Sequence, residues 1–222
     1  MEELFQYHGP WVLLAVCAIA FVSSAIHGAI GVAGGIILSA ALAPIIGVAP
    51  IVPVVSVALL ISHSARAMLN RADFSWPVFI SVSVTAVPFI VVMALVYGRL
   101  SSTLIALVLG CVILLSIPMR HWAKSRQIRA NRRTLSGAGA VYGLLAGVSV
   151  GPGILLAPFM LGYGLKKEAF VATLAGIALL TNITRVGVFG ATDLLSSQYM
   201  LLGVLCGLMT IPGNWVGRTM LR

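Results

Sequence analysis

Two arginines near the ends of long apolar segments are the first residues whose chemistry needs explaining. Arg66 and Arg185 each follow a run of mostly apolar and small residues. A guanidinium offers several N–H donors to an oxyanion and stays charged. Ser56 and Thr173 precede the two arginines by ten and twelve residues, and such hydroxyls hydrogen-bond an anion or their own backbone. We interpret these four residues as candidate anion ligands, with snorkelling of the arginines to lipid headgroups as the alternative.

Glycines and a proline interrupt two of the apolar segments. Gly34 and Gly35 stand together in one, and Gly151-Pro152-Gly153 stands in the other. Because proline has no N–H and fixes its own φ, a helix is expected to break there. A broken helix inside a membrane exposes N–H groups at the start of its second part, and these bind anions. The four glycines are therefore candidate substrate-binding residues, with close helix packing as the alternative.

The residues that catalysis or metal binding would need are scarce. Gly147-Val-Ser149-Val-Gly151 fits the G-x-S-x-G pattern of hydrolase nucleophiles, but no histidine follows residue 121. The carboxylates all lie at expected membrane edges or termini, and they are Glu2, Glu3, Asp73, Glu168 and Asp193. No metal-ligand spacing or phosphate loop is present, and the three cysteines form no CxxC pair. We therefore expect no enzyme activity, no cofactor and no metal.

The composition indicates an outer surface that faces lipid. Hydrophobic residues make up 60% of the 222 residues and charged residues only 9%, against roughly 25% charged in soluble domains. A helix needs about 20 apolar residues to cross a membrane, and segments of that length recur along the chain. They predict an all-α polytopic membrane protein with seven transmembrane helices, at 11–33, 50–69, 75–97, 101–119, 136–160, 169–190 and 198–218.

The chain reads as two similar halves. The matched positions are Gly47 with Gly164, Ser56 with Thr173, Arg66 with Arg185, and Asp73 with Asp193, at offsets of 117 to 120 residues. A collinear series at a nearly fixed offset indicates an internal duplication. We expect a first repeat unit of four spans at 1–119, a basic cytoplasmic loop at 120–134, and a second unit at 135–222 with three spans, lacking the last. Each unit opens with a glycine-broken helix.

Two histidines and an asparagine fall inside the apolar segments. Asn182 matches His63 between the halves, and we include Asn182 among the candidate substrate ligands. His27 lies close to the first pair of glycines. We interpret both histidines as packing residues, with proton coupling as the alternative.

Three motifs resemble a known family. They are Gly-Val-Ala-Gly-Gly-Ile-Ile at 31–37, Gly-Pro-Gly-Ile-Leu-Leu-Ala-Pro at 151–158, and Gly-Leu-x-x-x-x-x-Val-x-Thr at 164–173. Spread over both halves, they are similar to the TauE/SafE (TSUP) sulfite exporter family of anion transporters. The sequence departs from the family pattern in its late Pro44 and its missing eighth span. The resemblance implies a duplicated four-helix unit and export of sulfite, sulfonates or related sulfur-containing or organic anions.

Lysines and arginines set the expected orientation. With seven single crossings, nine basic residues fall on the side of the N-terminus and five on the other. The positive-inside rule then predicts a cytoplasmic N-terminus in a plasma (inner) membrane. In the alternative, each glycine-broken segment dips in and returns, so that the repeats are inverted and the split becomes twelve to two. We expect single crossings because 11–33 is long enough to span.

These features together predict transport of a small anion, held between two halves that rock for alternating access. The expected partners are the anion and the lipid bilayer, and a second copy in a homodimer could cover the surface left by the missing helix. Nucleic acid is not expected, because no stacking platform of basic and aromatic residues is visible. The alternative is a non-transporting membrane scaffold or assembly subunit whose basic loop docks an acidic partner.

Overall fold

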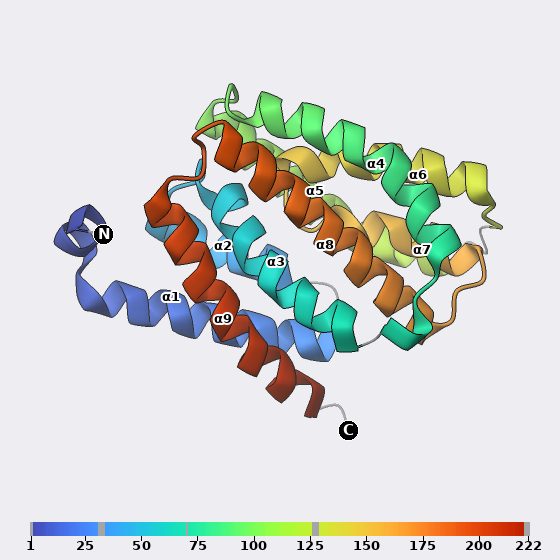
Figure 1. The fold of residues 1–222 in the computed structure, drawn as a ribbon, viewed down its shortest axis with the longest axis horizontal. Helices are drawn as coiled ribbons and strands as arrows, with labels where there is room; N and C mark the ends of the chain where they lie inside the picture. The colour runs from blue at the N-terminus through green and yellow to red at the C-terminus, as the bar shows by residue number, and fades with distance from the viewer. Residues whose placement is uncertain (1, 31–33, 70, 126–128, 220–222) are drawn as a thin grey trace.

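The computed structural model describes residues 2–30, 34–69, 71–125 and 129–219, and these residues form helices joined by short turns, with no strand among them (Figure 1). The long helices are α1 (Glu2–Ile30), α2 (Gly34–Ile46), α3 (Ile51–Leu69), α4 (Trp76–Tyr97), α5 (Ser102–Ser125), α6 (Arg132–Val148), α8 (Lys167–Ala191) and α9 (Ser197–Thr219). Shorter pieces are η1 (Arg71–Asp73), η2 (Pro152–Leu156) and α7 (Ala157–Gly162). The all-helical prediction is confirmed for these ranges.

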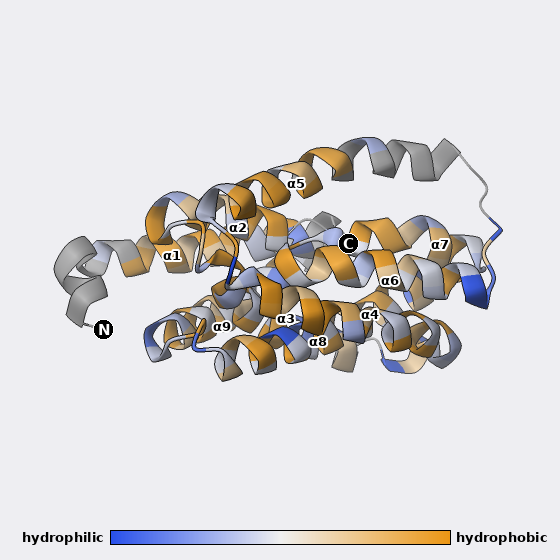
Figure 2. Cartoon of the chain, turned by 90° about the horizontal axis from the view of Figure 1, so that it is seen from above, coloured by the Kyte–Doolittle hydropathy of each residue, from blue (hydrophilic) through white to orange (hydrophobic). Residues whose placement is uncertain are grey.

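Within the part of the chain that the structure describes, four helices are long and apolar enough to cross a membrane, at Ile51–Met68, Trp76–Tyr97, Lys167–Ala191 and Ser197–Gly217. They coincide with the predicted spans 50–69, 75–97, 169–190 and 198–218. Large apolar side chains such as Leu107, Val84 and Ile183 point outward, as expected of helices that face hydrocarbon. Figure 2 shows apolar residues over most of the helices, with hydrophilic residues gathered at the connection that leads into α6. The chain is a multi-pass membrane protein.

The segment 136–160 is not a single crossing, and this prediction was wrong. The chain runs along α6, breaks at 149–151 and returns through η2 and α7. The N–H of Ala130, just before α6, donates to the carbonyl of Gly162 at the end of α7 (3.1 Å). The two ends of this hairpin therefore lie together. Gly151 has a left-handed φ of 93° and is followed by a proline, and this backbone lets the chain reverse inside the protein.

The first apolar segment also folds back, and α2 is a helix between the predicted spans 11–33 and 50–69. The N–H of Gly34 at the start of α2 donates to Nδ1 of His27 in α1 (2.9 Å), and Ser23 Oγ donates to the carbonyl of Gly34 (2.7 Å). The start of α2 therefore lies beside the last turns of α1. Most of the predicted span 11–33 belongs to α1, and its residues 31–33 lie outside the described residues.

The two central helices, α3 and α8, pack against each other. On one flank, α9 packs along α1 and α3, and on the other, α4 packs along α6 and α8. Glycines bring α4 and α6 close: a Cβ at Gly143 would lie 2.4 Å from the carbonyl oxygen of Ala86. The helix α5 contacts η2, α6 and α7 and stands at the outside of the bundle (Figure 2). The helices α3 and α8 thus lie where the two hairpins meet.

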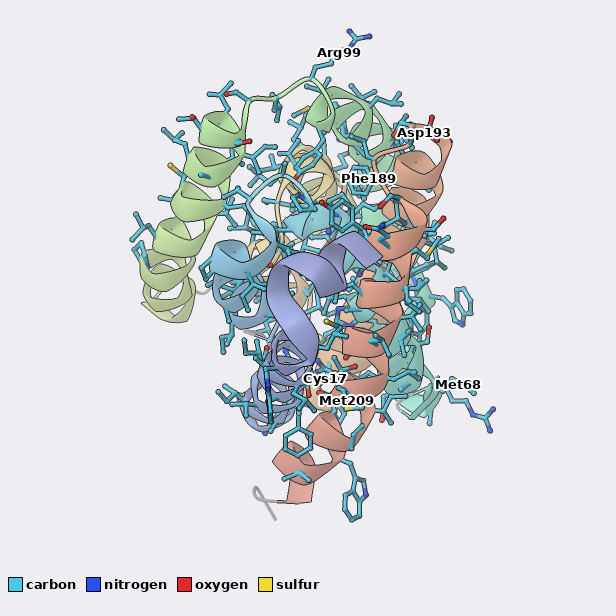
Figure 3. All side chains as sticks on the ribbon, turned by 90° about the vertical axis from the view of Figure 1, so that its left-hand side faces the viewer. Cys17, Met68, Arg99, Phe189, Asp193 and Met209 are labelled. Carbon is cyan, nitrogen blue, oxygen red and sulfur yellow. The ribbon has the colours of Figure 1, made fainter. Side chains whose placement is uncertain are left out.

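The molecule has one basic end. The basic side chains there, on or beside the helix ends, are Arg66, Arg71, Arg129, Arg132, Arg133, Lys166 and Lys167. The opposite end, which we call the Arg99 end, holds the turns at 47–50, 98–101 and 192–196, and Tyr97 Oη donates there to the carbonyl of Ala49 (2.8 Å). Figure 3 shows Arg99 and Asp193 at this end and Met68 at the other. In Figure 1 the N-terminus lies toward the Arg99 end and the C-terminus toward the basic end.

Candidate functional site

The two chain reversals touch each other in the interior. Gly35 in the first turn of α2 lies against Val150 and Leu59, and a Cβ there would come within 2.9 Å of both side chains. Gly151 lies against Ile36, and a Cβ there would come within 2.3 Å of Ile36 Cγ1. The chains thus approach closely at both glycines, and Gly151 in addition has a positive φ that favours glycine. The two predicted glycine breaks are therefore in direct contact with each other.

Arg185 of α8 reaches this meeting point. Its side chain is only 3% exposed. One Nη atom donates to the carbonyl of Ser149 at the second break, and the other lies 3.5 Å from Ser56 Oγ of α3. Ser56 donates its own proton to the carbonyl of Val52 (2.6 Å), so its oxygen faces the guanidinium as an acceptor. We call Arg185, Ser56, Ser149 and Asn182 the Arg185 cluster.

The charge of Arg185 has no acidic partner among the described residues. Asp73, Glu168 and Asp193 are all exposed, and Nε of Arg185 is buried without a hydrogen-bond partner. An uncompensated charge away from water costs several kcal/mol. Ion-pairing does not explain this arginine, and an intramembrane charge of this kind indicates a functional role. A small anion would supply the missing acceptor.

More polar groups follow on the same face of α8. Asn182 and Thr181 stand one turn before Arg185 and are buried, and residues three or four apart share a helix face. Asn182 donates to the carbonyl of Ala178 (2.7 Å), while its Oδ1 has no partner. Thr181 Oγ1 lies 2.9 Å from the hydroxyl of Tyr142 in α6. Polar groups thus line α8 for more than a turn beside the break.

Arg66 lies at the other end of α3, away from the Arg185 cluster. Its Nη1 contacts Nε2 of His27, the histidine whose Nδ1 accepts the Gly34 N–H. The ring of His63 packs edge-on to His27, with centroids 6.1 Å apart, and Nδ1 of His63 is buried without a partner. We call His27, His63 and Arg66 the His27–Arg66 cluster. The first glycine break therefore has a cationic neighbour of its own.

Two predicted ligands lie apart from both clusters. Thr173 is fully buried near the start of α8, and its Oγ1 accepts the N–H of Ser75 (2.9 Å). It precedes Arg185 by twelve residues, which is about 18 Å along a helix. Gly153 is half-buried in η2, where the nearest side chain to an added Cβ would be Leu174 at 3.5 Å. Of the nine predicted residues, Gly35, Ser56, Gly151 and Arg185 are the ones that meet at the break, with Asn182 one turn away.

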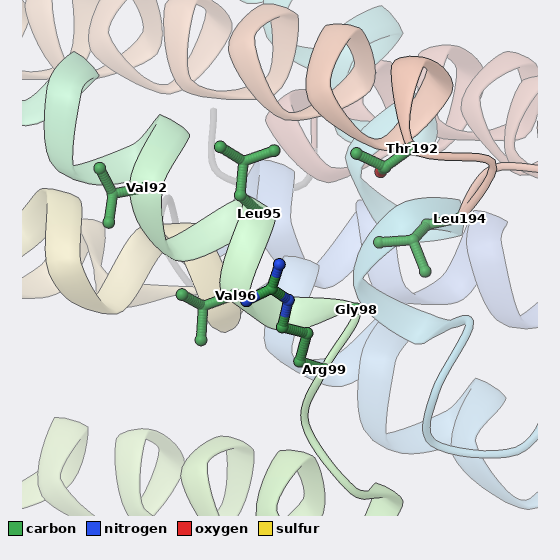
Figure 4. A pocket seen from close by; sticks show the side chains of 7 residues that line it. All are labelled: Val92, Leu95, Val96, Gly98, Arg99, Thr192 and Leu194. Atoms are coloured by element: carbon green, nitrogen blue, oxygen red, sulfur yellow. The ribbon is translucent and has the colours of Figure 1, made fainter.

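A surface cavity of about 560 Å³ opens at the Arg99 end. Figure 4 shows Arg99 and Thr192 among its otherwise apolar lining, between the ends of α4 and α8. This cavity is outside the meeting point of the breaks, which are in direct contact with each other. In the described part of the chain, no group of three or more His, Cys, Asp or Glu residues could hold a metal ion.

Sequence reasoning missed several members of this site. Ser149 was weighed only as a nucleophile, yet its carbonyl is what Arg185 binds. The sequence assigns no ligand role to Tyr142 or Thr181, and it favours a packing role for His27. The available signal was polarity inside an apolar segment, but only the fold shows that these side chains turn toward one another.

Comparison with known proteins identifies the family. The family model described as Sulfite exporter TauE/SafE matches residues 16–222. Neither a search of curated proteins nor a search of solved structures found a match. The family match covers the apolar helices, both glycine breaks and both arginines. The chain therefore belongs to the TauE/SafE family of sulfite exporters.

Proposed function

We propose that this protein exports a small oxyanion, sulfite or a related sulfur-containing or organic anion, past Arg185 at the meeting point of the two breaks. The observation that supports this proposal is a buried guanidinium, that of Arg185, without a carboxylate partner among the described residues, in a chain of the TauE/SafE family. An oxyanion accepts several N–H bonds from one guanidinium. Binding it would relieve the cost of the unpaired charge.

The groups around Arg185 suit an oxyanion better than a cation. Arg185 offers Nε, Ser56 helps to position the guanidinium as an acceptor, and α2 begins at the same place. The first N–H groups of a helix lack intrahelical acceptors and attract anions. Gly34 and Gly35 let the anion approach that backbone. Asn182 lies one turn away and can rotate its amide toward the route. Thr173 and Gly153 lie apart from this place, so we assign them to the support of the start of α8 and of the second hairpin and not to the anion.

The helix contacts favour two repeat units of opposite orientation. Helix α1 packs on α9, and the corresponding first helix of the second unit, α6, packs on α4. The pairs α3–α9 and α8–α4 correspond in the same way. We propose that the units at 1–119 and 135–222 are related by a pseudo-two-fold axis in the membrane plane, as in transporters built from inverted repeats. The basic segment at 120–134 joins them, partly as helical extensions of α5 and α6.

Alternating access then follows from the close contact of the breaks. In this conformation Gly35 and Gly151 pack directly against the opposite hairpin, so the route is closed at its centre. Rocking of one unit against the other would separate the hairpins on one side at a time. The anion would be exposed first to one face and then to the other, without a continuous pore.

We further propose that the basic end is cytoplasmic. The positive-inside rule favours this placement in a plasma membrane, because basic side chains gather at that end and Arg99 stands at the other. The earlier expectation of a cytoplasmic N-terminus depended on single crossings. With the chain reversals, the N-terminus lies outside. Export of an anion then runs with a negative-inside potential, worth about 2.3 kcal/mol per charge per 100 mV, and no proton relay is needed.

Flux measurements in proteoliposomes test this function. Purified protein should give saturable efflux of radiolabelled sulfite that accelerates with a membrane potential negative on the side of the sulfite. Thiosulfate, sulfoacetate and simple carboxylates should compete to different extents. Protein-free liposomes are the control. Absence of saturable flux for every one of these anions would exclude transport and favour a structural role in the membrane.

A further inference from the structure

An aromatic pair fills the interior between the Arg185 cluster and the Arg99 end. Phe189 follows Arg185 by four residues on α8, so it lies on the same helix face, about 6 Å nearer the Arg99 end. Its ring packs against the ring of Tyr97 at the end of α4, with centroids 5.4 Å apart. Phe189 is fully buried and Tyr97 is 2% exposed. Figure 3 shows Phe189 inside the bundle of helices.

The two sides of Arg185 on α8 differ in polarity. Toward the basic end, Thr181 and Asn182 are buried polar side chains, and Oδ1 of Asn182 has no hydrogen-bond partner. Toward the Arg99 end, the residues from 186 to 191 are all apolar or small. An anion that crossed this second stretch would lose its water without gaining a hydrogen bond from an α8 side chain. This side of the route is therefore closed while the rings of Phe189 and Tyr97 stay in contact.

The hydroxyl of Tyr97 joins the two flanks of the molecule. Helix α4, which carries Tyr97, packs on α6 and α8, whereas α3 packs on α9 of the opposite flank. Tyr97 Oη donates to the carbonyl of Ala49 (2.8 Å) in the turn between α2 and α3. The backbone of Phe189 is held as well, because its carbonyl accepts the N–H groups of Leu194 and Leu195 (3.0 and 3.2 Å). The aromatic pair is thus anchored on α4, on α8 and on the α2–α3 turn.

We propose that Tyr97 and Phe189 form the outer barrier of the transport route. The two rings block the path from Arg185 to the Arg99 end, and the hydrogen bond from Tyr97 to Ala49 holds the barrier shut. Release of the anion at this end requires that hydrogen bond to break and the rings to separate. The barrier deepens the function proposed above and rests on it for the anion that passes and for the side of the membrane that the Arg99 end faces.

The competing explanation is that the pair only packs the bundle. A packing role predicts a loss of stability with no change in access, whereas a barrier predicts that access from the Arg99 end increases. Y97F separates the two roles, because it keeps the ring and removes only the hydroxyl. Y142F is the matched control, because it removes a tyrosine hydroxyl that lies 2.9 Å from Thr181 Oγ1, on the basic-end side of Arg185.

Thiol labelling from outside the cell tests the barrier. The reporter is S56C in a background without the three native cysteines, because this side chain is fully buried and lies 3.5 Å from Arg185. Intact spheroplasts are treated with a membrane-impermeant methanethiosulfonate that carries a sulfonate group. Labelling of S101C, in the turn at the Arg99 end, gives the rate of an accessible site.

The variants should rank by what they remove. Y97F should raise the labelling rate of S56C up to about fivefold, the effect of one hydrogen bond on the equilibrium between closed and open. F189A should raise it at least about tenfold, because the ring itself is gone. Y142F should leave it unchanged. Thermal unfolding of each variant is the folding control, and if F189A does not fold, the comparison of Y97F with Y142F decides.

The outcomes separate the barrier from the proposed function. An unchanged labelling rate in Y97F, whatever its thermal midpoint, overturns the barrier. An equal rise in Y142F also overturns it, because the effect would then reflect a general loosening of the bundle. If sulfite flux is saturable but labelling does not respond, the barrier fails and transport stands. If the protein moves no anion but Y97F still raises labelling, the proposed function fails and the closure at Tyr97 stands.

Discussion

At the scale of single residues, the decisive feature is a charge that the fold does not neutralise. The side chain of Arg185 is only 3% exposed. It donates to a carbonyl and to a hydroxyl, and no described carboxylate pairs with it. Structural buried charges are normally paired, because an unpaired one destabilises the protein. In the absence of an anion, Arg185 therefore lowers the stability of the folded protein. Its replacement should reduce transport without unfolding the protein.

Replacing Arg185 should abolish transport without loss of stability. In R185Q and R185M, sulfite flux should fall at least about tenfold, because charge-assisted hydrogen bonds contribute about 1.5–3 kcal/mol. The thermal midpoint in detergent should stay unchanged or rise, because the unpaired charge is gone. R185K keeps the charge without the planar fork and should be intermediate. A midpoint that falls in step with flux would assign the arginine a structural role.

Ser56 and Thr173 have matching places in the sequence but different surroundings in the fold. S56A should weaken the apparent sulfite affinity about fivefold, the effect of one hydrogen bond of about 1 kcal/mol, with little change in stability. T173A should leave flux nearly unchanged but lower the stability by a similar free energy, because the N–H of Ser75 loses its acceptor. Affinity from flux curves and thermal unfolding, measured on the same preparations, compare the two. Equal effects on flux would contradict this distinction.

At the scale of elements, the two reversals decide where the polar groups lie. An unbroken helix from Arg132 to Gly162 would carry Ser149 and Gly151 onward across the membrane, on different faces of the helix. The left-handed glycine and the proline after it stop α6 instead. Their reversal brings the carbonyl of Ser149 to Arg185 and the backbone of Gly151 to Ile36. The function therefore depends on the break itself as well as on side chains.

The glycines of this hairpin should differ sharply in tolerance. G151A combines a φ of 93° with a Cβ 2.3 Å from Ile36 Cγ1, so it should lower stability by more than about 1–2 kcal/mol and abolish flux. G153A is the matched control two residues away, where the added Cβ makes an ordinary 3.5 Å contact and flux should persist. Thermal unfolding and sulfite efflux measure the pair. Wild-type behaviour of G151A would show that the reversal is not required.

At the scale of the whole molecule, the reversals decide which loops share a side of the membrane. The N–H of Ala130 bonds the carbonyl of Gly162, so the connections before α6 and after α7 lie at the basic end together. A single crossing at 136–160 would have placed them on opposite sides. The basic residues of the two connections then combine into one strong signal for the positive-inside rule.

Cysteine accessibility should reveal this arrangement in cells. In a background without Cys17, Cys111 and Cys206, K166C and R129C should react with a membrane-impermeant maleimide only after permeabilisation. S101C, at the Arg99 end, should react in intact spheroplasts. Labelling of K166C from outside, with R129C protected, would restore the single-crossing topology.

The sequence by itself determined the medium and the helical class, and it singled out the candidate ligands. Scarcity of charge forces helices to face lipid, since only regular backbone satisfies its own hydrogen bonds there. Arg66, Arg185, Ser56 and the glycines stood out because they are costly in an apolar segment. What it could not determine is whether a broken segment continues across the membrane or returns. That depends on the backbone angles at a few glycines and on the partners of the resulting hairpin.

Only the tertiary structure decided which of the candidates meet. Ser56 and Arg185 are 129 residues apart in the chain but lie together because α3 and α8 pack against each other. Thr173, equivalent in the sequence, binds a turn instead. The helix α2 and the hairpin through α7 were missed because a length count treats any long apolar segment as a span, whereas close backbone contacts at Gly35 and Gly151 fix the reversals. The residue types thus indicated that the chain can bind an anion, and the packing of the helices determined which of the candidate groups lie together.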